Sequence, residues 1–353
     1  MKNKFAGYEK DMVITMQMGK VSEVVLKRSI LKNIGHRRPE VLLPARQGED
    51  CSLVKFPQED TCAITSNTVT IECNLMGSLA IYRAVNDLAA SGAEPVGMML
   101  NLLLPESAQE SQIKELMREM EGVCAQENIE ILGGHTQVTD AVSGIVLCVT
   151  GIGRVKDSFS SGNMLMMPGD DLVMTGWAAM EGTALIAEAQ EKTLLSRLPE
   201  EFVQEAKDMC QSISIRKEAE LACKAGIPIH GMHNLSEGGV FGGLWEIASR
   251  SNVGICVDLE DIPLKQVTVE ICEVFDYNPY MLAANGSLLI ATPKGNQLVA
   301  ELMKEGIYAS VIGRATGDKD RVVISGEEKR FLEPAGKEKD EIYKLRQNQS
   351  ATI

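Results

Sequence analysis

Residues 82–95 read YRAVNDLAASGAEP, and this stretch predicts a closely packed helix that ends beside a strand. Its small and apolar residues suit tight packing, and Gly92 suits the left-handed conformation that often terminates a helix. Asn86 and Asp87 stand near its carboxyl end, where an acidic side chain gains nothing from the helix dipole. A lone aspartate is ordinarily a solvated surface residue, so the rest of the chain must decide whether Asp87 has a function.

The composition is that of a globular protein long enough for two domains. The 353 residues are 44% hydrophobic and 24% charged, with a formal net charge of −14. This acidic balance argues against nonspecific binding to DNA or RNA, whose phosphates require a basic surface. It does not argue against a small anionic ligand, because backbone amides and a metal ion neutralise phosphate locally.

Nine cysteines are spread along the chain without a C-x-x-C pair. An odd, scattered set is a poor framework for disulfides or zinc, so reduced cysteines are expected. The first residues, MKNKFAGYEKDMV, lack the apolar core of a signal peptide. No apolar run reaches the roughly 20 residues of a membrane span. We therefore expect a cytoplasmic protein that binds neither nucleic acid nor membrane.

Strands and helices alternate along most of the chain, which predicts an α/β or α+β fold. Residues 95–105 form a continuous apolar run of strand length, and residues 106–128 carry apolar side chains on one helical stripe. Helices are also predicted at 19–35 and 239–250, and a strand at 288–292. Polar residues before Pro168 interrupt the alternation. The expected division is 1–158, 159–330 and a polar tail at 331–353.

Five short polar or glycine-rich segments stand at predicted strand ends or helix starts, where α/β proteins usually build their sites. They are QGEDCSLV (47–54), ITSNTVT (64–70), AVNDLAASGA (84–93), LGGHTQVT (132–139) and HNLSEGGVFGG (233–243). Glycine pairs let a ligand approach the backbone, whose free amides hold phosphate oxygens. Carboxylates such as Asp50 and Asp87 supply the hard oxygen ligands that Mg²⁺ prefers.

Each segment also has a structural interpretation that the residues leave open. The sequence around Asp50 suits a turn, and the pair Gly133-Gly134 at the end of a strand suits a bulge or tight bend. His135 is more often a hydrogen-bonded structural histidine than a ligand. The segment that begins at Ser236 suits a capped helix start. The order of the five segments, and not any one of them, carries the functional interpretation.

In that order the segments resemble the aminoimidazole ribonucleotide (AIR) synthetase superfamily, and most of all its HypE-like, AIR synthase-related group. The matching pieces are GED (48–50), VNDLAASGAEP (85–95), LLLPE (102–106), GGHTQVT (133–139) and MHNLSEGGVFGGLWEIA (232–248). The most specific of them is VNDLAASGA. The resemblance implies a two-domain fold, in which an N-terminal α/β domain dimerises through its sheet and is followed by a C-terminal α/β domain.

The resemblance also implies a site between the two domains, with ATP in the cleft and Mg²⁺ ions on its phosphates. By this correspondence Asp50 and Asp87 bind metal, and a small carbonyl- or amide-containing substrate receives the phosphoryl group. The residues expected around the cofactor are Asn67, Asn86, Gly133, Gly134, Thr136, Asn234, Glu237, Gly238 and Gly239. His135 and His233 are candidates for a general base by location alone.

Two departures from the superfamily pattern open a second interpretation. Asn67 and Asn234 stand where relatives commonly carry aspartate, and each amide keeps an oxygen ligand but removes a negative charge. A lower charge weakens a Mg²⁺ site beside a polyanion. We therefore expect either an ATP- and Mg²⁺-dependent enzyme or a catalytically weakened relative that binds a nucleotide or a maturation partner protein. HypE works on a C-terminal cysteine, whereas the last cysteine of this chain is Cys272. Dehydration of a carbamoyl group on the chain's own C-terminal cysteine is therefore not expected.

Overall fold

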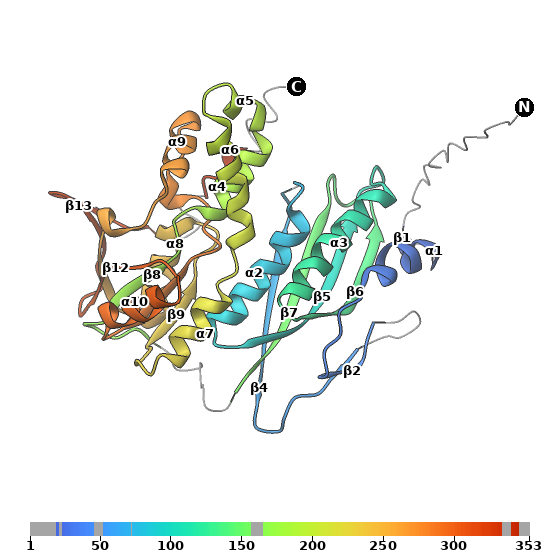
Figure 1. The fold of residues 1–353 in the computed structure, drawn as a ribbon, viewed down its shortest axis with the longest axis horizontal. Coiled ribbons are helices and arrows are strands. Elements are labelled where there is room, and N and C mark those ends of the chain that lie inside the picture. Colours follow the sequence, from blue (N-terminus) through green and yellow to red (C-terminus); the bar gives the residue numbers. More distant parts are fainter. Residues whose placement is uncertain are drawn as a thin grey trace, which may run out of the picture.

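The structure, a computed structural model, describes residues 19–20, 23–45, 52–71, 73–156, 165–333 and 340–345. Two sheets with their helices stand side by side, one from each half of the chain (Figure 1). The predicted α/β architecture of two domains is therefore confirmed. Among the helices in these ranges, none is both long enough and apolar enough to cross a membrane.

The N-terminal half contains seven strands and three helices within the described ranges. They are β1 (Gly19–Lys20), β2 (Val41–Leu43), β3 (Leu53–Val54), β4 (Thr61–Val69), β5 (Glu94–Leu104), β6 (Glu130–Val138), β7 (Val146–Val155), α1 (Glu23–Val25), α2 (Met76–Ala90) and α3 (Glu110–Gln126). The helix predicted at 19–35 is instead a succession of short pieces, because α1 passes into a π-helical turn at Leu26–Ile30 and a 3₁₀ turn at Leu31–Asn33.

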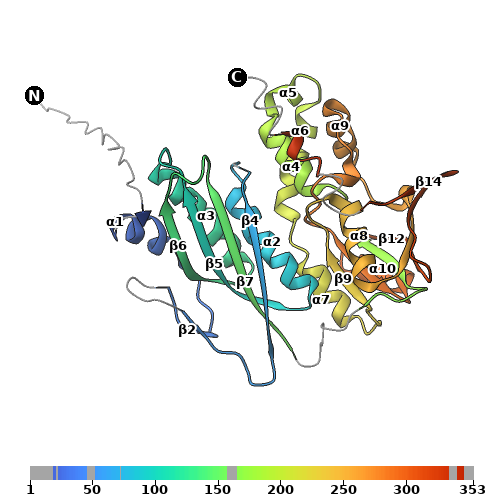
Figure 2. The same ribbon diagram turned by 180° about the vertical axis from the view of Figure 1, so that it is seen from behind.

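The main N-terminal sheet has the order β1-β6-β5-β7-β4. Strands β5 and β6 run parallel, and the other neighbours are antiparallel. Helices α2 and α3 cover one face of this sheet, and Figure 2 shows the strands from the opposite side. On that opposite face Ile64 of β4 is 68% exposed. The sheet therefore has one face buried by helices and one face, here called the open face, that no helix of the described ranges covers.

The glycine pair of β6 lies inside the strand and not at its end, which corrects the predicted position. The pairing of β6 with β5 shifts register between Met98 and Met99. Met98 pairs with Ile131 and Met99 pairs with Gly133, so Leu132 is the extra residue. This irregularity agrees with the bulge interpretation. A Cβ atom on Gly134 would lie 1.7 Å from the carbonyl oxygen of Leu100, so the close approach of the two strands requires glycine there.

The C-terminal half contains the remaining elements. They are β8 (Asp171–Thr175), β9 (Gly231–Asn234), β10 (Gly254–Asp258), β11 (Leu288–Thr292), β12 (Ala309–Thr316), β13 (Arg321–Ser325), β14 (Glu328–Phe331), α4 (Met180–Ala189), α5 (Glu191–Leu195), α6 (Glu200–Asp208), α7 (Arg216–Lys224), α8 (Gly239–Ser251), α9 (Gln266–Phe275) and α10 (Gly295–Lys304). The helix predicted at 239–250 and the strand predicted at 288–292 are confirmed as α8 and β11.

The second sheet has the order β14-β13-β10-β12-β8-β11-β9. Helix α8 packs on one face, where Leu244 and Ile247 join the buried side chains of β10 and β12. Helices α7 and α10 pack on the other face, against β8 and β11. Helices α4, α6 and α9 form a further layer, visible above the sheet in Figure 1, and their buried side chains belong to the same cluster as those of α2.

Helix α2 joins the two halves of the molecule. Leu79 and Leu88 pack in a cluster that includes Leu185 of α4, while Ala89 packs against Ala219 of α7. The helix is rich in small residues, which allows the close packing that its sequence predicts. The apolar core is therefore continuous from one domain to the other.

Residues 340–345 lie against the body of the protein, although the sequence predicted a loose polar tail here. Ile342 is 3% exposed and Leu345 is 4% exposed, and both belong to the cluster that contains α2 and α4. Two apolar residues at this spacing, Ile342 and Leu345, are enough to anchor a short segment that is otherwise polar. We call residues 340–345 the C-terminal strap.

Candidate functional site

The carboxylate of Asp87 lies where strands from both domains meet. Its Oδ2 atom accepts hydrogen bonds from Asn67 Nδ2 at 2.8 Å and from Thr65 Oγ1 at 2.9 Å, both on β4. Its Oδ1 atom accepts a hydrogen bond from Asn234 Nδ2 at 3.0 Å, at the end of β9. Three residues that the sequence singled out, Asn67, Asp87 and Asn234, are therefore brought together across the domain boundary.

Asn234 continues into a buried chain of polar contacts. Its Nδ2 also donates to Asn285 Oδ1 at 3.2 Å, and Asn285 Nδ2 donates to Glu181 Oε2 on α4. Glu181 Oε1 accepts from Arg83 Nε at 3.1 Å, and Arg83 stands on α2. Asn285 and Glu181 are fully buried, so these bonds form in an interior from which water is excluded. We call Arg83, Glu181, Asn285, Asn234 and Asp87 the polar chain.

Asn86 has a different role from its neighbour. It is fully buried, its Nδ2 donates to the carbonyl oxygen of Ile213 at 2.7 Å, and its Oδ1 accepts from the amide of Ile215 at 3.0 Å. Both groups belong to the segment that leads into α7. Asn86 thus satisfies two backbone groups that would otherwise be buried without partners. Asn86 therefore binds the backbone of the C-terminal domain, and these two hydrogen bonds do not involve any residue of the polar chain.

The turn before α8 is held by the C-terminal strap. The carboxylate of Asp340 accepts hydrogen bonds from the amides of Gly238 at 2.8 Å, Ala283 at 3.2 Å and Ile342 at 2.8 Å. Tyr343 donates its hydroxyl to Glu237 Oε1 at 2.7 Å. Burial raises the pKa of Asp340 to about 6, although these amide bonds favour the charged form. Sequence reasoning missed Asp340 because the strap was predicted to be a loose tail.

The glycines at this turn are required by its geometry. Gly238 has a φ of 85° and Gly239 has a φ of 66°, which is the left-handed region. A Cβ atom on Gly239 would lie 2.6 Å from the carbonyl oxygen of Tyr280. The sequence motif SEGG therefore has a packing reason in addition to any contact with a ligand.

The two candidate histidines lie apart from Asp87. His135 on β6 stands in the same cross-strand row as Asn101, Cys148 and Thr68, which places it on the open face of the sheet. Asn67 points to the other face, toward α2. His135 Nε2 lies 3.2 Å from Gln137 Oε1. His233 Nε2 lies 2.8 Å from Glu246 Oε2 on α8, so its contact is also local.

Gly133, Gly134 and Thr136 all lie on β6, in the N-terminal sheet. Thr136 is 9% exposed and alternates with His135, so its side chain is on the helix-covered face. The hydrogen bonds of the polar chain, which run from Arg83 to Asp87, do not include these three residues. Their assignment to a phosphate remains a prediction from the resemblance.

A divalent metal ion does not fit the surroundings of Asp87. The three side chains that contact this carboxylate present N–H or O–H groups to it, whereas a metal ion requires neighbouring oxygens that face the ion. Within the ranges that the structure describes, no group of three or more His, Cys, Asp or Glu side chains is arranged to hold a metal. Asp50, the other predicted metal ligand, lies outside the described residues.

One acceptor atom beside Asp87 lacks a partner among the described residues. Asn234 is 5% exposed, both of its Nδ2 contacts are made, and its Oδ1 atom is buried without a hydrogen-bond partner in the described part of the chain. An unpaired buried acceptor costs about 1–3 kcal/mol. Amino and hydroxyl groups, which a nucleotide possesses, are the kind of donor that satisfies such an atom.

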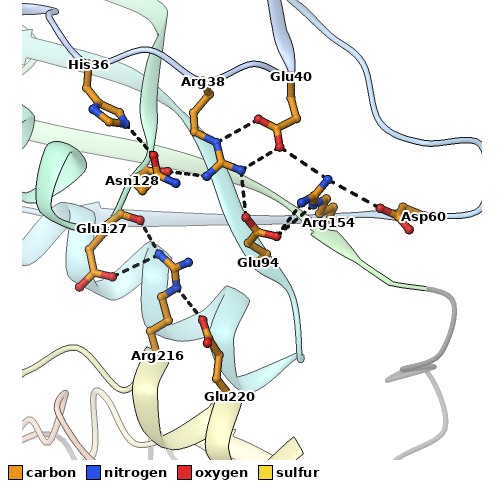
Figure 3. A network of polar contacts seen from close by, with 10 residues as sticks. All are labelled: His36, Arg38, Glu40, Asp60, Glu94, Glu127, Asn128, Arg154, Arg216 and Glu220. Carbon is orange, nitrogen blue, oxygen red and sulfur yellow. Dashed lines mark hydrogen bonds and ion pairs between the residues drawn. The ribbon is translucent and has the colours of Figure 1, made fainter. Parts of the chain in front are cut away.

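A second polar network lies beyond the carboxyl end of α2, around Glu94 at the start of β5, and ties the N-terminal segment to the sheet (Figure 3). Glu94 accepts from Arg38 Nη2 at 2.9 Å and from Arg154 Nε at 3.0 Å. Burial raises the pKa of Glu94, but these hydrogen bonds outweigh burial and hold it below its ordinary value. Arg216 of α7 reaches Glu127 Oε2 at 3.6 Å and so joins the two domains. Every carboxylate drawn in Figure 3 faces a cation, which is typical of a structural network.

A large cavity, of ≈ 1010 Å³, lies elsewhere in the C-terminal domain. Trp177 and Tyr308 stack in it with ring centroids 4.4 Å apart, and acidic residues of α6 line one wall. Its lining contains none of the residues that the sequence predicted for the site. Size alone does not make it the functional site, because the polar residues of both domains converge on Asp87 instead.

Sequence reasoning missed Arg83, Glu181 and Asn285. A signal was present, since Arg83 and Glu181 are charged residues inside helices made mostly of small and apolar side chains. Charges in such positions are rarely buried unless they are paired. The pairing itself could not be read from the sequence, because Arg83 and Glu181 are 98 residues apart.

Comparisons with known proteins agree with the two-domain architecture. Residues 48–155 match the AIR synthase related protein N-terminal domain, and residues 167–325 match the AIR synthase related protein C-terminal domain. A putative hydrogenase expression/formation protein of Methanocaldococcus jannaschii is 27% identical over 314 residues, which is 87% of this chain and 91% of that protein. The carbamoyl dehydratase HypE of Rhodobacter capsulatus is 24% identical over 249 residues, 69% of this chain and 70% of that protein.

Solved structures share the fold at lower identity. The hydrogenase maturation protein HypE of Escherichia coli superposes with a TM-score of 0.75 at 20% identity, covering 90% of this chain and 98% of that one. A HypE in complex with ATP gives a TM-score of 0.72 at 18% identity, covering 93% and 98%. A HypE–HypF complex gives 0.65 at 20% identity, covering 78% and 90%. Since both family domains match in order and together span most of the sequence, the chain belongs to the AIR synthase-related, HypE-like protein family.

Proposed function

We propose that this chain binds ATP between its two domains, beside Asp87, and uses it to activate a carbamoyl- or amide-type compound. The observation that carries the proposal is the convergence of both domains on one carboxylate. Asn67 and Asn234, which the resemblance assigns to the cofactor, come from different domains and both donate to Asp87. Ligand sites occur preferentially where domains meet.

The names of the relatives support the class of reaction. The Rhodobacter capsulatus relative is a carbamoyl dehydratase, and one of the HypE structures is a complex with ATP. A carbonyl or amide oxygen that receives a phosphoryl group becomes a leaving group, which is the usual purpose of such activation. The chain would contribute mainly by positioning the reactants and by stabilising charge on the transferring group.

Particular groups of the chain have roles in this proposal. The buried Oδ1 of Asn234 accepts a hydrogen bond from the nucleotide. The amides of Gly238 and Gly239 are already bonded to the Asp340 carboxylate and to the carbonyl oxygen of Ser236, so a phosphate at the start of α8 would have to displace Asp340. His135 and His233 remain candidates for a general base. Mg²⁺ at Asp50 remains a sequence-based proposal, and no step is assigned to a metal at Asp87.

Calorimetric titration with ATP, followed by a phosphate-release assay with a panel of carbamoyl and primary amide compounds, tests the proposal. We expect saturable ATP binding and phosphate release that depends on one class of compound. Asp87→Ala should abolish turnover, whereas Asp208→Ala, on the exposed side of α6, is the matched control that should not. A wild-type protein that does not bind ATP contradicts the proposal.

A second candidate function is binding of a nucleotide or a partner protein without turnover. It is favoured by the neutral donors around Asp87, which leave this carboxylate without the charged environment of a phosphoryl-transfer site. The HypE–HypF complex among the structural neighbours supports a protein partner in maturation. ATP binding without phosphate release for any compound of the panel distinguishes this function from the first.

The assembly is part of the same proposal. The open face of the N-terminal sheet, which carries the exposed Ile64, suits a homodimer formed by joining sheets. A cytoplasmic location and the division at residues 158 and 159 also stay proposals.

A further inference from the structure

The orientation of every amide in the polar chain is determined by Arg83. A guanidinium group donates hydrogen bonds and cannot accept them, so both of its contacts with Glu181 Oε1 make Glu181 the acceptor. The other oxygen of Glu181 then faces Asn285, which must present its Nδ2 to it. With Nδ2 turned toward Glu181, the Oδ1 of Asn285 is the atom that lies toward the next residue, 3.2 Å from Asn234 Nδ2.

The same constraint reaches Asp87 through Asn234. Since Asn285 offers an oxygen, Asn234 must present Nδ2, at 3.2 Å, and this nitrogen also lies 3.0 Å from Asp87 Oδ1. Turning the Asn234 amide over would bring its oxygen against two acceptor oxygens at these distances. The nitrogen of Asn234 therefore points at Asp87 for a physical reason, and not through an arbitrary choice between amide nitrogen and oxygen.

The result is an Asp87 carboxylate surrounded by donors. Asn67 and Thr65 donate to Oδ2 and Asn234 donates to Oδ1, so three of the roughly four acceptor positions of a carboxylate are occupied. The two asparagines do not act as the oxygen ligands that the sequence suggested. They turn their N–H groups toward the carboxylate and supply the positive partial charge that a cation would supply.

We propose that Asp87 of this chain is a hydrogen-bond acceptor that joins the two domains, and that the affinity of the chain for divalent metal ions does not depend on it. Asn67 and Asn234 replace a metal ion at this position. The proposal departs from the sequence-based assignment of Mg²⁺ to Asp87. The test with Mn²⁺ is independent of the proposed function, and only the titration with ATP depends on it.

Titration with Mn²⁺, followed by electron paramagnetic resonance, tests this role on the full chain without nucleotide. Asp87→Asn should leave the Mn²⁺ affinity within about twofold of the wild type, including the case in which neither protein binds Mn²⁺. Asn67→Asp combined with Asn234→Asp places three carboxylates together, so this variant should bind Mn²⁺ at least roughly tenfold more tightly than the wild type. A tenfold or greater loss in Asp87→Asn, or no gain in the double variant, overturns the proposal.

Folding of the double variant is checked by circular dichroism, because Asn234 is buried. If it does not fold, the single variant Asn67→Asp, at a partly exposed position of β4, provides the gain-of-binding measurement with the same criterion. ATP titrations in EDTA and in Mg²⁺ form a separate arm. We expect the ratio of the ATP affinities in the two buffers to be the same for the wild type and for Asp87→Asn. Failure to bind ATP in either buffer contradicts the proposed function, while the Mn²⁺ result still decides the role of Asp87.

Discussion

Arg83 and Asp87 stand one turn apart on α2 and hold the two ends of the same polar chain, which runs through the C-terminal domain between them. The helix and the chain together close a ring across the domain boundary. Arg83 brings the only guanidinium of this ring, and Glu181 is fully buried opposite it. The ring therefore depends on Arg83 for both its charge balance and the direction of its hydrogen bonds.

Arg83→Met should lower the free energy of unfolding by about 3–5 kcal/mol, because it leaves the carboxylate of Glu181 buried without its cation. Urea denaturation measures the change. Arg314→Met is the matched control, since the Arg314 side chain is 67% exposed where it pairs with Asp171. Loss of such an exposed pair should cost less than about 1 kcal/mol. Equal losses in the two variants would show that the buried ring adds no more stability than an exposed ion pair.

Asp340 should make stability depend on pH. Its pKa is about 6 in the folded protein against 3.8 as the ordinary value, so the folded protein holds this proton more tightly than the unfolded chain. Its contribution is therefore greatest below about pH 3.8 and declines as the pH rises through about 6, by a total on the order of 3 kcal/mol.

Asp340→Asn removes this titration. In urea unfolding at about pH 4 and about pH 7, the stability of the wild type relative to the variant should decrease at the higher pH. Other groups with raised pKa values, such as Glu119, are present in both proteins and cancel from the difference. A difference that stays constant between the two pH values contradicts the assignment.

Two glycines should respond in opposite directions to alanine. Gly134→Ala forces a Cβ atom against the backbone of Leu100 at a φ of 147°, so it should cost more than about 2 kcal/mol. A Cβ atom added to Gly122, within α3, would meet no neighbouring atom of the described residues within 4 Å, so Gly122→Ala should stabilise by about 0.5–1 kcal/mol. Thermal denaturation of the two variants compares the signs directly.

The open sheet face should control the oligomeric state. Ile64→Asp places a charge on that face, where Ile64 is 68% exposed in the single chain, and should convert a dimer to a monomer in light scattering. Leu195→Asp, on α5, is the control, because Leu195 is 45% exposed but lies away from the sheet. A dimer that tolerates Ile64→Asp and dissociates with Leu195→Asp assigns the interface to the helical layer.

The sequence predicted the elements whose signals are local. Helix α8 and strand β11 lie within a residue of their predicted positions, because glycine turns and apolar runs mark their ends. The joining of Asn67, Asp87 and Asn234 followed from the resemblance, which preserves the order of the motifs. The direction of the Asn234 amide could not be predicted, since it follows from Arg83 and Glu181 through Asn285, a set of contacts distant in sequence.

Other differences also have physical causes. Whether Gly133-Gly134 ends a strand or interrupts it depends on how closely β5 approaches, which is a property of the sheet and not of the segment. The strap was expected to be loose because its composition is polar, yet Ile342 and Leu345 find a buried surface formed by remote residues. In the segment 19–35 Val25 and Ile30 are buried, but Val24 is 61% exposed and regular α-helical hydrogen bonding stops after Val25.

Helix α2 contributes side chains to the cores of both domains, and the buried Asn86 completes the backbone hydrogen bonds of the segment before α7. Neither half of the chain can therefore form its native interior without the other. We expect heat or denaturant to melt the molecule in one cooperative transition, with equal calorimetric and van't Hoff enthalpies. Two domains by architecture are thus a single folding unit, and a gene fragment that encodes either half alone should yield an aggregating polypeptide.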